Sequence, residues 1–563
     1  MAKKRRWKIW LYILVGIFFA VLLFIVYFNI VTRIDPPTEM LPGEMGYERE
    51  MTGPGSYRCE DSWLRLNDHG LWELYIEGSP LELGTLHGLL CGELVRAQED
   101  AFVDQIKLMI PSESYLKFLK YFTAWFNRDL DEYIAQEYLL EIYGVSAFAS
   151  DNYGFIGPKY DRILNYHAAH DIGHALQNLN LVKCTAFGVW NEKSSDRALM
   201  IGRNFDFYVG DTFAENKIIA FMNPDQGYKF ASVTWGGMIG VVSGMNEKGL
   251  TVTLNSAKSD IPFRAKTPVS LIAREILQYA SNIEEALSIA SSRESFVSES
   301  FLVGSAFDHK AVVIEKSADT TVLYDPDTNF IILTNHFQSD YFRNSPLTIE
   351  NMANETSVYR HERVEELLAE YEHLGYRDAA SILRNRQGLG NQDIGMGNEK
   401  AINQLIAHHS IIFKPEEKKF WVSTSDWQLG PYICYDLDSV FSNMGNKDIE
   451  QLSIPGLEIM ADQSMHPGTF QYDDFIRYRT ILGGIHLAIK EELEIKDEKV
   501  VIRDFVTSNP EYFLVYVTLG HYYQMLGNKT EAIKYYNFAL TKEISSADER
   551  KAIENNLQEC QDE

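Results

Sequence analysis

The sequence predicts an α+β protein whose main domain combines antiparallel strands with a layer of helices, between an apolar N-terminal helix and a helical tail. Strand-like runs with turn signals between them fill the middle of the 563-residue chain. Two helical segments with one apolar stripe, 270–279 and 283–291, interrupt these runs, as expected for helices that cover a sheet. Because 45% of the residues are apolar, the chain has ample material for a large core.

The first residues, 1–34, differ from the rest and predict a cytoplasmic basic stub followed by a single transmembrane anchor. Basic residues at 3–6 and 8 precede an uncharged run from Ile9 to Thr32, which at about 1.5 Å per residue crosses a hydrocarbon core of about 30 Å. The run is longer than the apolar part of a signal peptide, and no small-x-small cleavage motif follows it. The basic flank places the N-terminus in the cytoplasm and the remainder of the chain on the extracytoplasmic side of the membrane.

Charge and cysteine content exclude two further classes. A formal net charge of -27 argues against a nucleic-acid-binding protein, because no basic face easily dominates such a field. Five cysteines, an odd number, are too few for a disulfide scaffold and leave at least one free thiol. If one pair bonds, Cys59 with Cys91 is the candidate.

The segment that follows the anchor reads as one strand and then helices. An alternating strand covers 70–78, and 81–90 carries small and apolar residues at helical spacing. His170 and His174 lie four residues apart on a predicted helix, the spacing of zinc ligands. The glutamate that follows the first histidine in zinc proteases is absent and no third ligand can be named, so we expect structural histidines and no metal.

A cysteine opens the next strand pair, 182–190 and 198–207, which a polar turn joins into a hairpin. The hairpin would bring Arg203 beside Cys184. A nearby guanidinium lowers the pKa of a thiol and favours the nucleophilic thiolate. Asp206, at the end of the second strand, would hold an amine or fix the arginine. Cys184 is therefore the candidate nucleophile.

Further strands follow, at 218–221, 229–235, 239–245, 250–255, 301–304, 311–315 and 330–337, with a final hairpin at 409–413 and 419–424. Asn255 ends one strand, where its amide can donate to the oxyanion that forms when a thiolate attacks a carbonyl. An Asx turn explains this position equally well. Arg360 and Arg363 lie at the start of a helix that Thr356 or Ser357 caps, and both could equally be surface partners of neighbouring glutamates.

The tail is helical. Residues 441–500 predict a linker with one helix, 472–495, and residues 501–563 predict one tetratricopeptide-like unit, since small and apolar residues occur where two antiparallel helices would touch. A single unit more readily packs on its own domain, or docks a protein partner, than forms an extended binding surface.

Three ordered motifs carry a resemblance to a known family: Gly78 to Leu90, the nucleophile hairpin KCTAFGVW/GRNFDF, and the V-I-E strand followed by L-T-N-H-F. They resemble the acyl-coenzyme A:6-aminopenicillanate acyltransferase-like family of cysteine N-terminal-nucleophile (Ntn) hydrolases, related to choloylglycine hydrolases. The similarity runs from about Gly70 to Leu437. It implies a four-layer αββα sandwich of antiparallel sheets, with residues 35–183 as the small-chain segment and 184–440 as the catalytic core.

The resemblance also implies site roles. The chain would cut itself before Cys184, whose new α-amine would act as the base. Arg203 and Asp206 would orient this amine and the substrate, and Asn255 would bind the oxyanion. Asn335 matches a substrate-site or structural asparagine, and Arg360 matches the supporting arginine better than Arg363 does.

The implied activity is hydrolysis or acyl transfer at the C–N bond of a small acyl amide through a Cys184 thioester, without a cofactor. The chain departs from the penicillin-related enzyme at Lys183, which stands where that enzyme has glycine, so cleavage of the Lys183–Cys184 bond is an open question. Two alternatives are an unprocessed hydrolase with a Cys184–His336 dyad and a catalytically silent, membrane-tethered scaffold.

Overall fold

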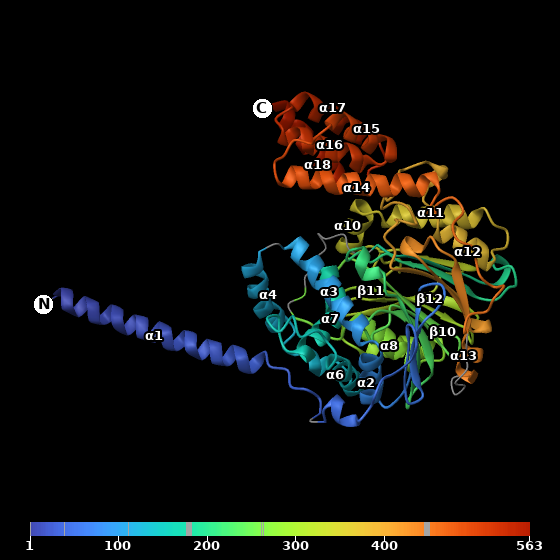
Figure 1. Cartoon of the computed structure of the whole chain (residues 1–563), viewed down its shortest axis with the longest axis horizontal. Coiled ribbons are helices and arrows are strands. Elements are labelled where there is room, and N and C mark those ends of the chain that lie inside the picture. Colours follow the sequence, from blue (N-terminus) through green and yellow to red (C-terminus); the bar gives the residue numbers. More distant parts are fainter. Residues whose placement is uncertain are drawn as a thin grey trace.

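Two β-sheets formed by the described residues lie at the centre of the molecule (Figure 1). The computed structural model describes residues 2–38, 40–110, 112–175, 183–260, 262, 264–443 and 451–562. The first sheet has, in spatial order, β1 Glu50–Gly53, β2 Ser56–Cys59, β3 Ser62–Leu66, β4 Trp72–Gly78, β7 Ile218–Pro224, β8 Phe230–Thr234, β9 Ser243–Asn246, β10 Leu250–Ser256, β11 Glu299–Ser305, β12 Lys310–Lys316 and β13 Thr321–Tyr324. The second has β14 Phe330–Leu333, β5 Thr185–Val189, β6 Met200–Phe205, β15 His409–Lys414, β16 Lys419–Ser423 and β17 Tyr432–Asp436.

Alternation of side chains along the strands creates a core on each side of the second sheet. Ala186 and Ile201 belong to the core between the two sheets, whereas Phe187 and Met200, one position away, belong to the core beneath the helices that cover this sheet. The second sheet is thus buried on two faces, and its strands are apolar on both.

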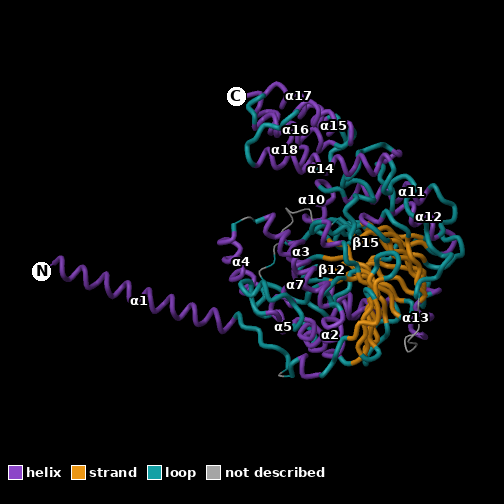
Figure 2. Tube along the Cα trace, viewed as in Figure 1, coloured by secondary structure: helices purple, strands orange, loops and turns teal. Residues whose placement is uncertain are grey.

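Helices cover the outer face of each sheet. The layer against the first sheet contains α2 Pro80–Leu90, α3 Gly92–Met109, α5 Leu130–Tyr133, α6 Gln136–Ser146, α7 Lys159–Ala175, α8 Val269–Tyr279 and α9 Ile283–Ser292. The layer against the second contains α11 Ser357–Ala369 and α12 Tyr376–Leu383, preceded by α10 Pro346–Asn354. A short helix, α13 Leu437–Asn443, follows β17. The predicted four-layer αββα fold is confirmed, and Figure 2 shows the sheets enclosed by helices.

The small residues predicted to allow close packing lie where α2 crosses α6. A Cβ added at Gly84 would lie 1.9 Å from the carbonyl oxygen of Glu141, and one added at Gly144 would lie 2.5 Å from the amide nitrogen of Thr85. No larger side chain fits at either position without moving a backbone.

Three features differ from the sequence-based expectation. Strands β1–β3 were not predicted, because their short polar sequences carry little periodicity. The β4–β7 pair is parallel, which the helices between these strands in the sequence permit. All five cysteines lie in the described part of the chain and are free, so the Cys59–Cys91 candidate is wrong.

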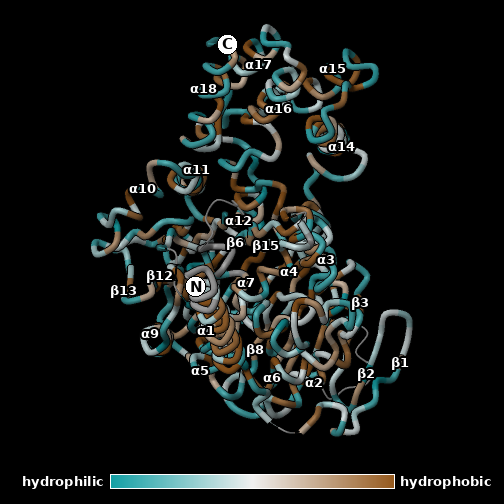
Figure 3. Tube along the Cα trace, turned by 90° about the vertical axis from the view of Figure 1, so that its left-hand side faces the viewer, coloured by the Kyte–Doolittle hydropathy of each residue, from teal (hydrophilic) through white to brown (hydrophobic). Residues whose placement is uncertain are grey.

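The N-terminal helix α1, Ala2–Val31, projects away from the rest of the molecule (Figure 1). Its segment Trp10–Val31 has a mean hydropathy of 2.8 and is long and apolar enough to cross a membrane. In Figure 3, which views the molecule from the side of the N-terminus, much of α1 has the brown colour of hydrophobic residues. A further helix, α4 Glu113–Phe126, packs against its C-terminal end through aromatic side chains.

The C-terminal helices form a separate layer beyond α10 and α11 (Figure 2). They are α14 Phe470–Lys490, α15 Glu498–Ser508, α16 Phe513–Met525, α17 Lys529–Leu540 and α18 Ala547–Asp562. The predicted linker helix 472–495 therefore belongs to this bundle as α14. Its core includes Trp427 and Leu429, which come from the sheet domain, so the bundle is packed onto that domain. Its description as a tetratricopeptide-like unit stays a prediction.

Candidate active site

The β5–β6 hairpin places Cys184 at the end of the second sheet, directly before β5. Ala186 pairs with Arg203 and Thr185 with Asn204, and the amide of Lys183 donates to the carbonyl of Asp206 at 3.0 Å. In this register the Nη2 atom of Arg203 lies 3.5 Å from the Sγ atom of Cys184. The structure therefore contains the predicted contact between the thiol of Cys184 and the guanidinium of Arg203.

Arg203 is completely buried and is held by several acceptors. Its Nη1 atom donates to the carbonyl of Val242 at 3.0 Å and to the Oγ atom of Ser243 at 2.6 Å. Its Nη2 atom also donates to the carbonyl of Leu254, and the guanidinium lies 4.4 Å from the ring centre of Phe205. These bonds, mostly to β9 and β10 of the opposite sheet, fix the guanidinium beside the thiol.

The thiol of Cys184 is also completely buried. Burial raises its pKa to about 11, although the charge of Arg203 and a hydrogen bond from the backbone of Asp206 act in the opposite direction. The Asp206 carboxyl adds to the rise. In the uncut chain, therefore, the thiol is protonated at neutral pH and needs a base.

Arg360, from α11, holds the other end of the same residue. Its Nη1 atom donates to the carbonyl of Cys184 at 2.5 Å and to the Oγ1 atom of Thr185 at 2.8 Å. Its Nη2 atom donates to the Oδ1 atom of Asn335 at 2.7 Å. Arg363, the fallback, contacts Asn385, Asn391 and Glu366 instead.

Asn335 links this arginine to the first sheet. Its Nδ2 atom donates to the carbonyl and Oγ atoms of Ser256, at 3.0 and 2.9 Å. Ser256 directly follows Asn255, so Arg360 and Asn335 join the end of β10 to Cys184. A positioning role fits this geometry better than direct contact with a reacting thiol.

Asp206 is buried between two arginines. Burial raises its pKa to about 7, whereas Arg360 and Arg203 act to lower it. Its Oδ2 atom lies 3.5 Å from the Nε2 atom of Gln404. Among the described residues, its Oδ1 atom has no hydrogen-bond partner. A carboxyl that changes charge near neutral pH is suited to accept a proton or to bind an amine.

Asn255 lies at the end of β10, as expected, but its amide is engaged elsewhere. Its Nδ2 atom donates to the carbonyls of Leu333 and Thr334, at 3.2 and 3.1 Å, and its buried Oδ1 atom has no partner within the described part of the chain. To bind an oxyanion, the Nδ2 atom would have to release at least one of these carbonyls. The oxyanion role stays a prediction.

Residues that the sequence did not reveal surround Lys183. Gln404 donates from Nε2 to the carbonyl of Lys183 at 2.8 Å, which is the carbonyl that self-cleavage would attack. The ammonium of Lys183 forms an ion pair with Glu399 and lies 3.9 Å from Glu355. Its side chain is only 6% exposed. No signal in the sequence identifies these residues, because more than two hundred positions separate Gln404 from Lys183.

His336, the alternative base, contacts hydroxyl groups and not the thiol of Cys184. Its Nδ1 atom lies 2.8 Å from the Oγ atom of Ser357 and 3.2 Å from the Oγ1 atom of Thr334. Burial, together with the charges of His361 and Arg360, lowers its pKa to about 3. Among the hydrogen bonds of the described residues, none joins His336 to Cys184, so the structure gives the dyad no support.

The side chains of His170 and His174 lie outside the described residues. Within the described part of the chain, no group of three or more His, Cys, Asp or Glu side chains is arranged to hold a metal ion.

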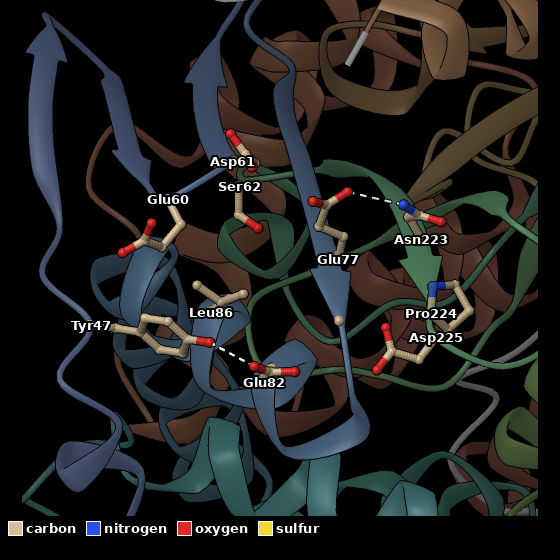
Figure 4. A pocket seen from close by; sticks show the side chains of 11 residues that line it. Tyr47, Glu60, Asp61, Ser62, Glu77, Glu82, Leu86, Asn223, Pro224 and Asp225 are labelled. Atoms are coloured by element: carbon tan, nitrogen blue, oxygen red, sulfur yellow. Dashed lines mark hydrogen bonds between the residues drawn. The ribbon is translucent and has the colours of Figure 1, made fainter. Parts of the chain in front are cut away.

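A cavity of about 520 Å³ lies at another place in the first sheet (Figure 4). It is lined by acidic residues whose oxygens accept bonds from neighbours: Tyr47 donates to Glu82 at 2.9 Å and Asn223 donates to Glu77 at 3.0 Å. None of the six predicted site residues lines it. The candidate site is a buried cluster, since Cys184, Arg203, Asp206 and Asn255 have no exposed surface.

Part of this site lies in a segment that matches a family model. Residues 190–426 match the family model "Acyl-coenzyme A:6-aminopenicillanic acid acyl-transferase". The match is narrower than the predicted 70–437 and begins after Cys184, so the assignment of this cysteine depends on the geometry. The described positions of Arg203, Asp206, Asn255, Asn335 and Arg360 all fall inside it.

Two curated relatives are similar over about half of the chain. One is an uncharacterized protein of Archaeoglobus fulgidus, 26% identical over 268 residues, which are 45% of this chain and 44% of that protein. The other is protein dcd1B of Dictyostelium discoideum, 24% identical over 272 residues, which are 46% of this chain and 52% of that protein. The alignments thus span about half the length of these relatives.

Solved structures give more distant similarities. An N-acylethanolamine-hydrolyzing acid amidase ortholog of Caenorhabditis elegans is 18% identical, with a TM-score of 0.30, over 41% of this chain and 93% of that one. A mutant conjugated bile acid hydrolase of Clostridium perfringens is 15% identical, with a TM-score of 0.31, over 45% of this chain and 92% of that one. The match to the acyl-coenzyme A:6-aminopenicillanic acid acyl-transferase family model is thus confined to residues 190–426 of the chain.

Proposed function

We propose that the chain is a membrane-anchored cysteine Ntn amidohydrolase or acyltransferase that acts on a small acyl amide through a thioester on Cys184. The observation that carries this proposal is that both sides of one peptide bond are held: Gln404 donates to the carbonyl of Lys183, and Arg203 donates to the thiol of Cys184. A carbonyl held by a donor next to a thiol held by a cation is the arrangement that attack of sulfur on carbon requires.

In the first step, the Sγ atom of Cys184 bonds to the carbonyl carbon of Lys183, and the peptide C–N bond breaks. The thiol proton ends on the released nitrogen, which becomes the α-amine of Cys184. Water then hydrolyses the thioester, which frees the carboxylate of Lys183 and restores the thiol. Gln404 stabilises the negative oxygen in both attacks, and Asp206, with its pKa near 7, is suited to carry the proton.

In the second step, the free α-amine takes the thiol proton while the sulfur attacks the carbonyl of a substrate amide. The substrate nitrogen leaves with that proton, and an acyl thioester remains on Cys184. Water or an acceptor amine then attacks the thioester and restores the thiol. Attack by water makes the protein a hydrolase, and attack by an amine makes it an acyltransferase. Arg203 stabilises the thiolate in every one of these attacks.

The burial of Cys184 supports cleavage before catalysis. Its side chain has no exposed surface, and Lys183 is 5% exposed, so a substrate reaches the thiol only after neighbouring residues move. Self-cleavage would cause such a movement, because it disconnects Lys183 from Cys184 and allows Lys183 to leave its partners. An intact chain with the same nucleophile would need another route of access.

The proposed location follows from α1. The apolar segment Trp10–Val31 would span the bilayer, and the basic residues that precede it favour a cytoplasmic N-terminus. The catalytic domain then lies on the extracytoplasmic side.

The test is intact mass and N-terminal sequencing of the full chain, beside Cys184→Ala and the control Cys434→Ala, which removes another completely buried thiol. We expect a fragment that begins at Cys184 in the wild type and the control, and an uncut chain in Cys184→Ala. A mass gain on Cys184 after incubation with acyl amides would then identify the acyl-enzyme. An uncut wild-type chain that forms no such adduct would overturn the proposal.

A further inference from the structure

Helix α4 has an apolar face that the described residues leave more than half exposed. Tyr115, Phe118, Tyr121 and Phe122 recur at three- and four-residue spacing, and 51%, 62%, 51% and 58% of their surfaces are exposed. The preceding helix α3 ends in Leu108 and Met109, which are also exposed. Aromatic side chains gathered in this way on a soluble surface mark a place of contact with another apolar phase.

The position of this face relative to α1 indicates which apolar phase contacts it. Phe28, near the C-terminal end of α1, stacks on Trp125 with ring centres 6.0 Å apart and planes at 14°, and it meets the edge of Tyr121 at 6.0 Å. Tyr27 also approaches Trp125, at 6.5 Å. Helix α4 therefore lies at the level where the candidate membrane span ends (Figure 1).

The connection after α1 holds this arrangement in place. Ile34 packs against the core of the main domain, and the Nε2 atom of Gln136 donates to the carbonyl of Pro37 at 3.3 Å. These two contacts join the segment that follows α1 to the main domain, which also carries α4.

We propose that α4 lies in the headgroup region of the bilayer that α1 crosses, with Phe118 and Phe122 in the acyl-chain boundary. Trp and Tyr side chains favour this depth because their rings have apolar and polar parts, and Lys117 and Lys120 at the flank of the face can extend their ammonium groups to the headgroups. The catalytic domain is then held against the membrane in one orientation, and an amphiphilic substrate dissolved in the bilayer meets the same surface.

The experiment uses the full chain reconstituted in phosphatidylcholine vesicles, with a polarity-sensitive maleimide dye on single introduced cysteines. Phe118→Cys tests α4, and Phe307→Cys, at a site that is 74% exposed in the turn between β11 and β12, is the matched control. All native cysteines are buried, and the wild type measures background labelling.

We expect the dye at 118 to emit at shorter wavelength, to be quenched by nitroxides on the acyl chains and to be shielded from iodide. The dye at 307 should show the opposite behaviour. Flotation with the vesicles tests the α1 anchor separately, so failure of the anchor and failure of the α4 contact are distinguishable. A floating chain in which iodide quenches both dyes equally would overturn the proposal, as would a chain that does not float.

A second variant guards against a local effect of the dye. Phe122→Glu, combined with the dye at 118, should raise iodide quenching at 118 several-fold while flotation persists, because a carboxylate is expelled from the acyl-chain boundary. Unchanged quenching would contradict insertion of this face.

Discussion

The two residues of the Lys183–Cys184 bond are held by different parts of the molecule. Cys184 is held by Arg203, its partner on the same hairpin, and by Arg360. Lys183 is held by Glu399 and Gln404. The cysteine side is built from strands and one helix start, whereas the lysine side is built from an irregular segment between α12 and β15.

That irregular segment is fastened to the C-terminal bundle. Lys400 forms an ion pair with Glu543 at 2.5 Å, and the Nδ2 atom of Asn398 donates to the carbonyl of Glu543 at 2.9 Å. Glu399, between these two residues, raises the pKa of Glu549 on α18, which burial brings to about 7. The bundle therefore positions the residues that hold Lys183. The comparison shows that the proposed nucleophile and the carbonyl that it would attack depend on separate supports.

The largest effect should come from the cysteine side. Replacement of Arg203 by methionine removes the cation beside the thiol, and a lost neighbouring charge moves a pKa by ~1–3 units. We expect cleavage to slow by about 10³-fold or more, measured by the appearance of the Cys184 N-terminus over time.

Its matched control is Arg363→Met, which removes an equally buried arginine that contacts Asn385 and Glu366 instead. Both variants should lose stability, but only Arg203→Met should lose cleavage. Equal rates in the two variants would remove Arg203 from the reaction.

The lysine side should respond next. Replacement of Gln404 by leucine removes the donor to the Lys183 carbonyl, and loss of one such donor slows acyl transfer by ~10²–10³-fold. We expect the rate of cleavage to fall by about 10²-fold, while the contact between Arg203 and the Cys184 thiol is unchanged. The control is Gln428→Leu, since Gln428 is equally buried and donates to the carbonyl of Leu383. Normal cleavage in Gln404→Leu would show that another group holds the oxyanion.

The contrast between these two sides also explains what the sequence could predict. Periodicity and turn signals placed the β5–β6 hairpin, and a hairpin fixes which residues face each other, so the Cys184–Arg203 contact followed from local rules. No such local rule predicts the contacts of Gln404 and Glu399, because tertiary packing determines where an irregular segment lies. The engagement of the Asn255 amide likewise could not be predicted, since its acceptors are the backbone carbonyls of Leu333 and Thr334, far along the chain.

The C-terminal bundle shows the same limit of prediction from the sequence. The antiparallel pair α16 and α17 was predictable from small residues, such as Gly520, where a Cβ would lie 2.4 Å from the ring of Tyr536. The contact of this bundle with the segment 398–400 was not, because it consists of one ion pair and a few hydrogen bonds. Sequence patterns report buried apolar faces far better than single polar contacts.

A smaller effect tests the ion pair of Lys183. Glu399→Gln keeps the shape but removes the charge, and Glu355 at 3.9 Å remains as a second carboxylate. We expect cleavage to slow by about tenfold, of the order of one partly buried ion pair, or ~1.4 kcal/mol. In the background of Lys183→Gly, the same replacement should have no effect, since the ammonium is absent. An equal loss in both backgrounds would mean that Glu399 acts on the fold of the segment and not on Lys183.

The last prediction concerns the carboxyl of Asp206, which interacts with Arg203 and Arg360 on the cysteine side and lies 3.5 Å from Gln404 on the lysine side. Burial raises the pKa of Asp206 to about 7, and its value in the unfolded chain is about 3.9. Between these values the folded state keeps a proton that the unfolded state has released, so the free energy of unfolding falls as pH rises, by up to ~1.4 kcal/mol per pH unit from this group. Asp206→Asn removes the group. Urea unfolding should therefore show the stability of the variant, relative to the wild type, increasing from about pH 4 to about pH 7 and then remaining constant.

The direction of this change decides how Asp206 takes part. A difference that grows with pH means that burial outweighs Arg203 and Arg360, and that the carboxyl is protonated over much of the acidic range and available as a proton carrier near neutrality. A pH-independent difference would mean that the two arginines keep Asp206 ionised, in which case its role is to bind the α-amine of Cys184 after cleavage. The same carboxyl would then belong to the mature site only, and the proton of the first step would have to leave by another path.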